Sequence, residues 1–85
     1  MRIELDEAAF EDLAHQVATD RKKALRILRL IRETVREPFS GTGKPEPLRH
    51  ALAGYWSRRI DREHRLVYRV EGDRLRIVAC RHHYG

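Results

Sequence analysis

The chain has 85 residues, of which 41% are hydrophobic and 36% are charged, and this length suits one small domain. We therefore expect a single domain over residues 1–85. No apolar run approaches the roughly 20 residues that a membrane-spanning helix needs. The first six residues contain two acidic side chains, and no apolar signal-peptide region follows them. The composition therefore predicts a soluble, cytoplasmic protein with no signal peptide and no membrane partner.

The positive charge lies in the second half of the chain. Residues 1–42 contain eight basic and eight acidic side chains, whereas residues 43–85 contain ten and five. Arginine outnumbers lysine 15 to 3, and a guanidinium group suits phosphate contacts and base stacking better than an ammonium group does. The second half therefore favours nucleic acid as a partner, although a basic composition serves solubility equally well.

Two helices are predicted in the first half, after a short strand at residues 1–5. Asp6 offers a cap for a first helix that ends near Ala18, and Asp20 opens a second helix that ends at Pro38. The apolar positions of the first helix are Phe10, Leu13, Ala14 and Val17. Those of the second are Ala24, Ile27, Leu28, Ile31 and Val35, with Arg26, Arg29, Arg32 and Arg36 on its solvent face. The linker is so short that the helices should form a hairpin.

From residue 48 onward, the apolar residues recur with a period of two, which predicts strands. In the first strand, Trp56, Arg58 and Ile60 fall on one side, and Ser57 and Arg59 fall on the other. A turn at residues 61–63 leads into the next strand. The helical hairpin should cover one face of the resulting sheet and leave the other face open and rich in arginine.

A second turn, at Gly72 and Asp73, should close a β-hairpin. The predicted pairs are Val70 with Leu75, Tyr68 with Ile77, Leu66 with Ala79 and Arg65 with Cys80. The predicted core face comprises Leu66, Tyr68, Val70, Leu75, Ile77 and Ala79, and the open face comprises Arg65, Val67, Arg69, Arg76, Val78 and Cys80. The predicted class is α+β, with the order β-α-α-β-β-β, an antiparallel sheet and a two-helix hairpin on one face.

Residues 39–47 contain two glycines and two prolines and form the longest irregular segment. Pro45 and Pro47 restrict the backbone on both sides of Glu46, which predicts an extended conformation for this residue. A carboxylate on a stiff loop is well placed for chemistry, but an acidic residue in a surface turn would look the same.

The segment at residues 81–84 carries Arg81, His82, His83 and Tyr84. Adjacent histidines on a strand point to opposite faces, so a metal site is not expected. Cleavage of RNA without a metal requires a base for the 2′-OH, a cation for the phosphorane and an acid for the leaving oxygen. Glu46, Arg65 and His83 have the chemistry for these roles, but composition does not show that they meet in space.

Five segments together resemble the YoeB family of type II toxins, within the RelE/ParE superfamily. They are PFSGTGKPEP, KPEPLRH, GYWSRRI, EHRLVYRV and ACRHHY. The resemblance is weak in the first 20 residues and nearly unbroken from Pro38 to Tyr84. It implies a RelE-like fold and the activity of an mRNA interferase, an endoribonuclease that enters the ribosomal A site and cuts the message there.

The resemblance also implies roles for individual residues. Glu46 corresponds to the general base, Arg65 to the phosphate stabiliser, His83 to the general acid and Tyr84 to a residue that positions or stacks on the substrate. The implied RNA-binding residues are Lys44, Arg49 and Arg59, and Arg49 stands where a lysine is familiar in the family.

The implied partners are mRNA on the ribosome and a YefM-type antitoxin whose acidic C-terminal segment lies against the basic face. A homodimer is a further candidate assembly, and no cofactor or metal is implied. Two other functions remain open. One is a ParE-like toxin that binds DNA gyrase, and the other is a noncatalytic RNA-binding module in which Tyr55, Trp56 and the arginines form a stacking platform.

Overall fold

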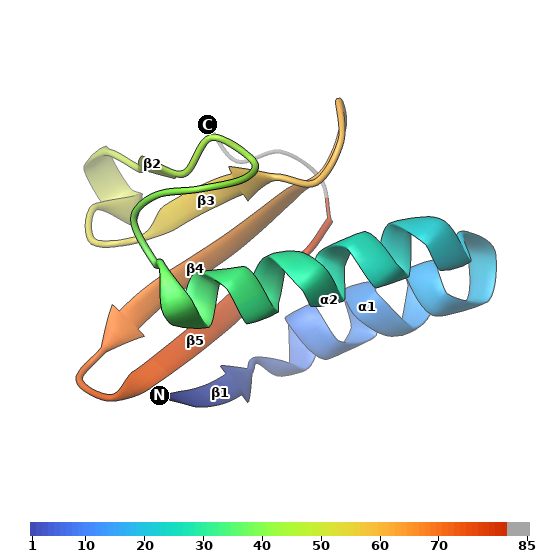
Figure 1. Ribbon diagram of the computed structural model, residues 1–85, viewed down its shortest axis with the longest axis horizontal. Helices are drawn as coiled ribbons and strands as arrows, with labels where there is room; N and C mark the ends of the chain where they lie inside the picture. Colours follow the sequence, from blue (N-terminus) through green and yellow to red (C-terminus); the bar gives the residue numbers. More distant parts are fainter. Residues whose placement is uncertain (82–85) are drawn as a thin grey trace.

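The computed structural model describes residues 1–81, in which a helical hairpin packs against one face of a five-stranded sheet (Figure 1). The elements are β1 (Arg2–Leu5), α1 (Glu7–Thr19), α2 (Arg21–Arg36), β2 (Glu46–Pro47), a 3₁₀ helix η1 (His50–Leu52), β3 (Trp56–Arg59), β4 (Arg65–Glu71) and β5 (Arg74–Ala79). The predicted α+β class and the hairpin on one face are confirmed. None of the helices in residues 1–81 is long and apolar enough to cross a membrane.

The sheet has the strand order β1-β5-β4-β3-β2 and is mixed rather than wholly antiparallel. β1 runs parallel to β5, with Ile3 opposite Leu75 and Leu5 opposite Ile77. All other neighbouring strands are antiparallel. The prediction of an antiparallel sheet was therefore wrong at one edge. Both helices lie between β1 and the later strands in the sequence, and this long connection lets β1 enter the sheet beside β5 in the parallel direction.

The prediction for α1 had the right bounds and was right that Leu13 packs against the core, but the rest of its buried side was wrong. Ala9 and Gln16 are buried, whereas Phe10 and Val17 are 58% and 60% exposed. The small Ala9 lets α1 approach the sheet closely, so the side that carries Ala9 faces the core. Asp6 does not cap α1 through its side chain. Its carboxylate instead accepts two hydrogen bonds of 3.0 Å from the Arg76 guanidinium in β5.

The prediction for α2 is closer to the structure. The Asp20 carboxylate accepts a hydrogen bond from the Lys23 backbone N–H, and the helix ends at Arg36, shortly before Pro38. The buried residues of α2 are Ala24, Ile27, Leu30, Ile31 and Thr34. Leu28, which was expected in the apolar stripe, is 48% exposed, because the buried side of α2 is centred on Ile27, Leu30 and Ile31.

The β4–β5 hairpin has the predicted register near its turn and a shifted register further away. Val70 lies opposite Leu75 and Tyr68 lies opposite Ile77, as predicted, but Ala79 lies opposite Val67 rather than Leu66. The shift between Val67 and Tyr68 marks a β-bulge, which inserts one residue and reverses the alternation beyond it. Strict alternation therefore misassigned Ala79 and Cys80, because Ala79 shares the side of Val67 and Cys80 belongs to the buried core cluster.

Candidate active site

Glu46 lies in β2, a short strand at the edge of the sheet. It is extended as predicted and pairs with Ser57 of β3, while Pro47 pairs with Trp56. The Arg59 backbone N–H donates a hydrogen bond of 2.7 Å to the Gly43 carbonyl, so the chain is already held against β3 three residues before Glu46. The backbone of Glu46 is therefore positioned by its contacts with β3.

Arg65 begins β4 and contacts Glu46 directly. Its Nη1 donates a hydrogen bond of 3.2 Å to the Glu46 Oε1. The Glu46 side chain is 59% exposed and that of Arg65 is 16% exposed, so the ion pair lies at the surface, with the carboxylate on its outer side. Two of the three groups that RNA cleavage needs are thus brought together by strands that are far apart in the sequence.

The remaining predicted residues divide into two sets. Arg59 is exposed at the end of β3 and lies opposite Arg65, so it is next to the ion pair. Lys44 and Arg49 are exposed on either side of β2, and Lys44 has a positive φ of 51°. His83 and Tyr84 lie outside the described residues, so their placement relative to Glu46 stays a prediction.

The open face of the sheet also carries half-buried arginines further from Glu46. The Arg69 guanidinium in β4 lies 5.3 Å from the centre of the Tyr55 ring and pairs with Glu71 at 3.6 Å. Trp56, by contrast, lies opposite the buried Tyr68 and packs against the core, with its ring centre 4.7 Å from that of Phe39. Tyr55 and Trp56 therefore do not form one stacking surface with the open-face arginines.

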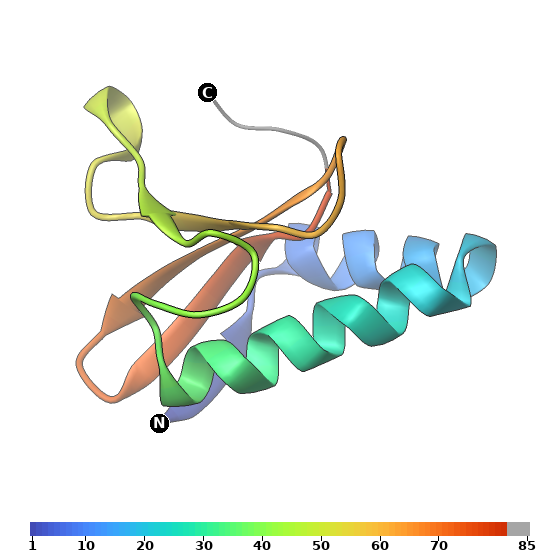
Figure 2. The same ribbon diagram turned by 45° about the horizontal axis from the view of Figure 1, so that its top comes forward.

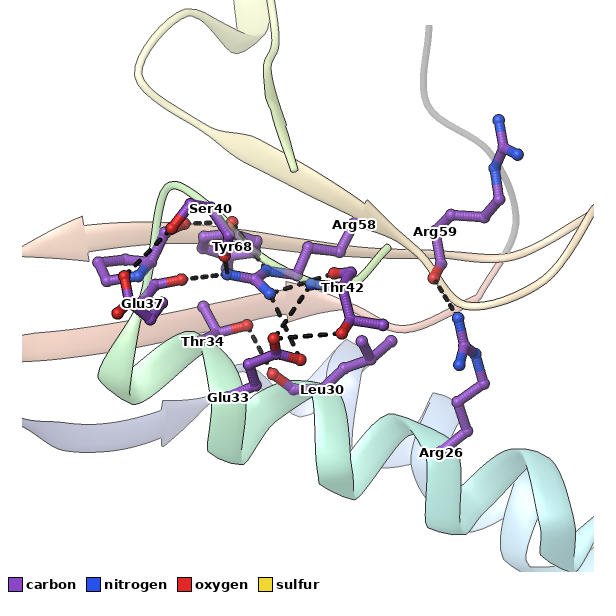
Figure 3. Close-up of polar contacts among 11 residues, drawn as sticks. Arg26, Leu30, Glu33, Thr34, Glu37, Ser40, Thr42, Arg58, Arg59 and Tyr68 are labelled. Atoms are coloured by element: carbon purple, nitrogen blue, oxygen red, sulfur yellow. Dashed lines mark hydrogen bonds and ion pairs between the residues drawn. The ribbon is translucent and has the colours of Figure 1, made fainter. Parts of the chain in front are cut away.

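A residue that sequence reasoning missed lies behind this site. Arg58 in β3 is 0% exposed, and its guanidinium donates hydrogen bonds to three backbone carbonyls of the loop that follows α2 (Figure 3). These acceptors are the carbonyls of Glu37, Ser40 at 2.7 Å and Thr42 at 3.1 Å. The signal was present in the sequence, since the alternation of β3 places Arg58 on the same side as Trp56 and Ile60.

Two further side chains complete this cluster, which we call the Arg58 network. Arg58 Nε donates to the Tyr68 hydroxyl at 3.3 Å, and that hydroxyl donates to the Pro38 carbonyl at 2.5 Å. Glu33 of α2 accepts hydrogen bonds from the Thr42 backbone N–H at 3.0 Å and hydroxyl at 3.2 Å, and lies 3.9 Å from Arg58 Nη1. These Thr42 hydrogen bonds, with the Arg58 charge, lower the pKa of Glu33.

Helix α2 also holds the turn between β3 and β4. Arg26 Nη2 donates to the Arg59 carbonyl at 3.3 Å (Figure 3). Arg26 Nε donates to the next carbonyl, that of Ile60, at 2.5 Å. Lys23 pairs with Asp61 in the same turn at 2.9 Å. The prediction that Arg26 belongs to a solvated face was therefore wrong, because its guanidinium ties α2 to the backbone beside Arg65.

Neither a metal cluster nor a reactive thiol is found in the described part of the chain. Within residues 1–81, no group of three His, Cys, Asp or Glu side chains is arranged to hold a metal ion. Cys80 is fully buried against α1, and burial, together with the Asp12 charge, raises the pKa of its thiol to about 12. A protonated, inaccessible thiol behaves as a small hydrophobic group.

Solved structures with the same architecture define the class. A YoeB/ParE toxin from Agrobacterium tumefaciens has a TM-score of 0.96 and 46% identity, over 99% of this chain and 100% of that one. A YoeB dimer and a heterotetrameric YoeB–YefM toxin–antitoxin complex, both from Staphylococcus aureus, have TM-scores of 0.91 and 0.89. Each is 40% identical over 99% of this chain and 98% of its own. The molecule is thus a toxin with the RelE-like α+β fold.

The sequence comparisons identify the family. Residues 5–84 match the model of the YoeB-like toxins of bacterial type II toxin–antitoxin systems. The toxin YoeB of Mycobacterium bovis is 56% identical over 82 residues, 96% of each chain, and the toxin YoeB of Escherichia coli is 50% identical over 84 residues, 99% of this chain and 100% of that one. The chain belongs to the YoeB-like toxins.

Proposed function

We propose that this toxin is a ribosome-dependent endoribonuclease, acting in the cytoplasm as one domain over residues 1–85. It cuts mRNA in the A site by attack of the substrate's own 2′-oxygen on the adjacent phosphate, without a metal ion. The contact between Glu46 and Arg65 carries the proposal, because it pairs a base with a phosphate-binding cation on an exposed, arginine-rich face.

In this mechanism Glu46 accepts the 2′-OH proton, and Arg65 stabilises the charge that builds on the phosphorane. The incoming phosphate binds the Arg65 donors that Glu46 does not use, and the free oxygen of the Glu46 carboxylate faces the 2′-OH. A guanidinium has five N–H donors, so Arg65 can bind a phosphate while one donor still orients the carboxylate. His83 protonates the departing 5′-oxygen, and Tyr84 positions the neighbouring base.

The RNA is held by additional cations around the ion pair. Arg59 lies opposite Arg65 and is exposed, which suits a contact with the scissile phosphate or its neighbour. Lys44 and Arg49 are exposed on either side of β2 and contact the flanking phosphates. These contacts should make binding of the ribosome-bound message weaker as salt increases.

We further propose a YefM-type antitoxin and a homodimer as protein partners. The support is that the Staphylococcus aureus relatives include a YoeB dimer and a YoeB–YefM complex. An acidic segment of the antitoxin would lie on the open face, whose arginines attract it through screened Coulomb forces. Measurement of affinity at low and high salt tests this, and an affinity independent of salt would contradict it.

Toeprinting of a message on translating ribosomes tests the enzymatic proposal. We expect new 3′ ends at the A-site codon with the wild-type protein and none with Glu46→Ala. Inhibition of gyrase supercoiling with an intact message would instead establish a ParE-like function. Binding of RNA without cleavage would establish a noncatalytic module, although Trp56 is partly buried against the core and so is not available as half of its stacking surface.

A further inference from the structure

We propose that Arg58 is a positioning residue, which sets the Glu46 carboxylate against Arg65 by fixing the loop at residues 37–43 from inside the protein. The inference rests on the proposed function for its effect on cleavage. Its structural part, that Arg58 fixes the loop, is independent of that function.

The hydrogen bonds of Arg58 go almost entirely to the loop. Four N–H to oxygen contacts reach the carbonyls of Glu37, Ser40 and Thr42 and the Tyr68 hydroxyl, and that hydroxyl bonds Pro38 in turn. A planar guanidinium offers five donors in fixed directions, whereas a lysine ammonium offers three donors from a single atom. Lysine at this position would therefore leave some of these partly buried carbonyls without a donor.

The loop is joined to Glu46 by a short segment whose backbone dihedral angles are restricted. Gly43, with a φ of +87°, lies directly on β3, and a Cβ there would be 3.0 Å from the Arg59 carbonyl oxygen and 3.2 Å from the Arg58 Cβ. Only Lys44 and Pro45 separate Gly43 from Glu46. Because Pro45 fixes its own φ, a shift of Gly43 is transmitted to Glu46 rather than absorbed by the chain.

Arg58 cannot take part in the reaction itself. It lies on the covered face of β3, where it is fully buried, whereas Glu46 pairs with Ser57 and Arg65 pairs with Arg59, the β3 residues on either side of it. Side chains of neighbouring strand residues point to opposite faces, so the backbone of β3 separates Arg58 from the ion pair. Its influence must therefore pass through the loop.

Hydrogen exchange of the Arg58→Lys variant tests the structural part without any activity assay. The Arg59 amide, which donates to the Gly43 carbonyl, should exchange at least about tenfold faster than in the wild type, while the central amides of β4 and β5 keep their protection. Tyr68→Phe, which removes one hydroxyl from the Arg58 network, should give a smaller increase at the same amide. Unchanged exchange at Arg59 in both variants would overturn the proposal.

Single-turnover cleavage on the ribosome tests the positioning role. Displacement of a catalytic group by about 1 Å can cost about 100-fold in rate, so Arg58→Lys should lower the maximal rate by about 10- to 100-fold and leave the concentration for half-maximal rate nearly unchanged. In a Glu46→Ala background, Arg58→Lys should cause no further loss, because the group that it positions is already absent.

Ile27→Val is the matched control, since it removes one methyl group from the buried core and no hydrogen bond of the Arg58 network. It should leave the cleavage rate near the wild-type value at a temperature where both variants are folded. Equal losses in Ile27→Val and Arg58→Lys, or a full further loss for Arg58→Lys in the Glu46→Ala background, would show that Arg58 only stabilises the fold. If the wild type cleaves nothing, the proposed function fails while the exchange experiment still decides whether Arg58 fixes the loop.

Discussion

The two faces of the sheet use the same residue type in opposite ways. On the face covered by the helices, Arg58 is fully buried and donates to four oxygen atoms of the protein. On the open face, which the helices leave uncovered (Figure 2), Arg65 has a single side-chain hydrogen-bond partner among the described residues, Glu46, and the neighbouring Arg59 side chain is exposed. Most N–H donors of the buried arginine bond to oxygen atoms of the protein, whereas the open-face arginines have donors available to bind a ligand.

The arginines of the two faces therefore have different roles, one in stability and the other in binding or catalysis, and neighbouring residues in the sequence can have either role. Arg58 and Arg59 are adjacent in one strand, yet the alternation of β3 sends one into the core and the other to the surface. Loss of Arg58 leaves partly buried carbonyls without donors and lowers stability, whereas loss of an open-face arginine mainly weakens binding or catalysis. The following predictions test whether the two faces differ in this way.

The largest expected effect is on catalysis by the open face. Glu46→Ala, Arg65→Ala and His83→Gln should each lower single-turnover cleavage of the ribosome-bound message by about 10² to 10⁴, the usual range for a general base or acid and for a charge-stabilising donor. Arg29→Ala is the control, because Arg29 is exposed on α2 and has no hydrogen bond or ion pair with the described residues. A wild-type rate in any of the three variants would refute the role of that residue.

The second prediction concerns stability and compares one substitution on the two faces. Arg58→Met should lower the free energy of unfolding by about 3–5 kcal/mol, because it leaves several partly buried carbonyls without a donor and removes the charge beside Glu33. Arg69→Met should cost about 1 kcal/mol or less, since the contacts of Arg69 with Tyr55 and Glu71 are largely solvated.

Urea denaturation of both variants measures this difference, and complete loss of a cooperative transition in Arg58→Met would also agree with it. Equal, small losses for the two variants would show that the buried arginine is no more important for folding than the exposed one.

The third prediction concerns the turn beside Arg65. Arg26→Ala removes hydrogen bonds from a charged donor to the carbonyls of Arg59 and Ile60, so it should cost about 1–3 kcal/mol of unfolding free energy. Arg29→Ala, one turn further along α2, should change stability by no more than about 0.5 kcal/mol. Thermal unfolding compares the two, and equal midpoints would mean that the Arg26 contacts do not stabilise the turn.

The smallest effect is expected at Cys80, which belongs to the covered side. With its pKa raised to about 12 by burial, the thiol is protonated at pH 8 in all but roughly one molecule in ten thousand. Iodoacetamide at pH 8 should therefore leave the native protein unmodified and alkylate Cys80 rapidly in urea, as mass spectrometry would detect. Rapid modification of the native protein would show that this part of the core opens readily.

Local sequence patterns correctly predicted the features that depend on residues close together in the chain. The prolines on both sides of Glu46 predicted its extended backbone, the Gly72–Asp73 turn predicted the register of the nearby pairs, and Asp20 predicted the start of α2. Features that depend on distant contacts were missed. The β-bulge between Ile77 and Ala79, the parallel pairing of β1 and the buried side of α1 each depend on a distant partner that no local pattern identifies.

In the candidate site, too, the sequence predicted some residues correctly and missed one that depends on distant contacts. Glu46 and Arg65 were chosen for their chemistry and their family resemblance, and the structure brings them to 3.2 Å. Arg58 was placed on the side of Trp56 and Ile60 by alternation alone, but its burial depends on four acceptors from residues 37–42 and 68. A charged residue at a core position of a strand should therefore prompt a search for an irregular loop that it could hold.

The most direct test of the account is the chemistry of the cut itself. A message carrying 2′-deoxyribose at the cleavage position lacks the attacking group but keeps the phosphate and base that the open face would hold. Our account predicts that this message is bound on the ribosome but not cut, and that the unmodified message yields a 2′,3′-cyclic phosphate or 3′-phosphate and a 5′-hydroxyl. Cleavage of the 2′-deoxy message at a comparable rate, or a 5′-phosphate found by mass spectrometry, would make water the nucleophile and remove the role assigned to Glu46.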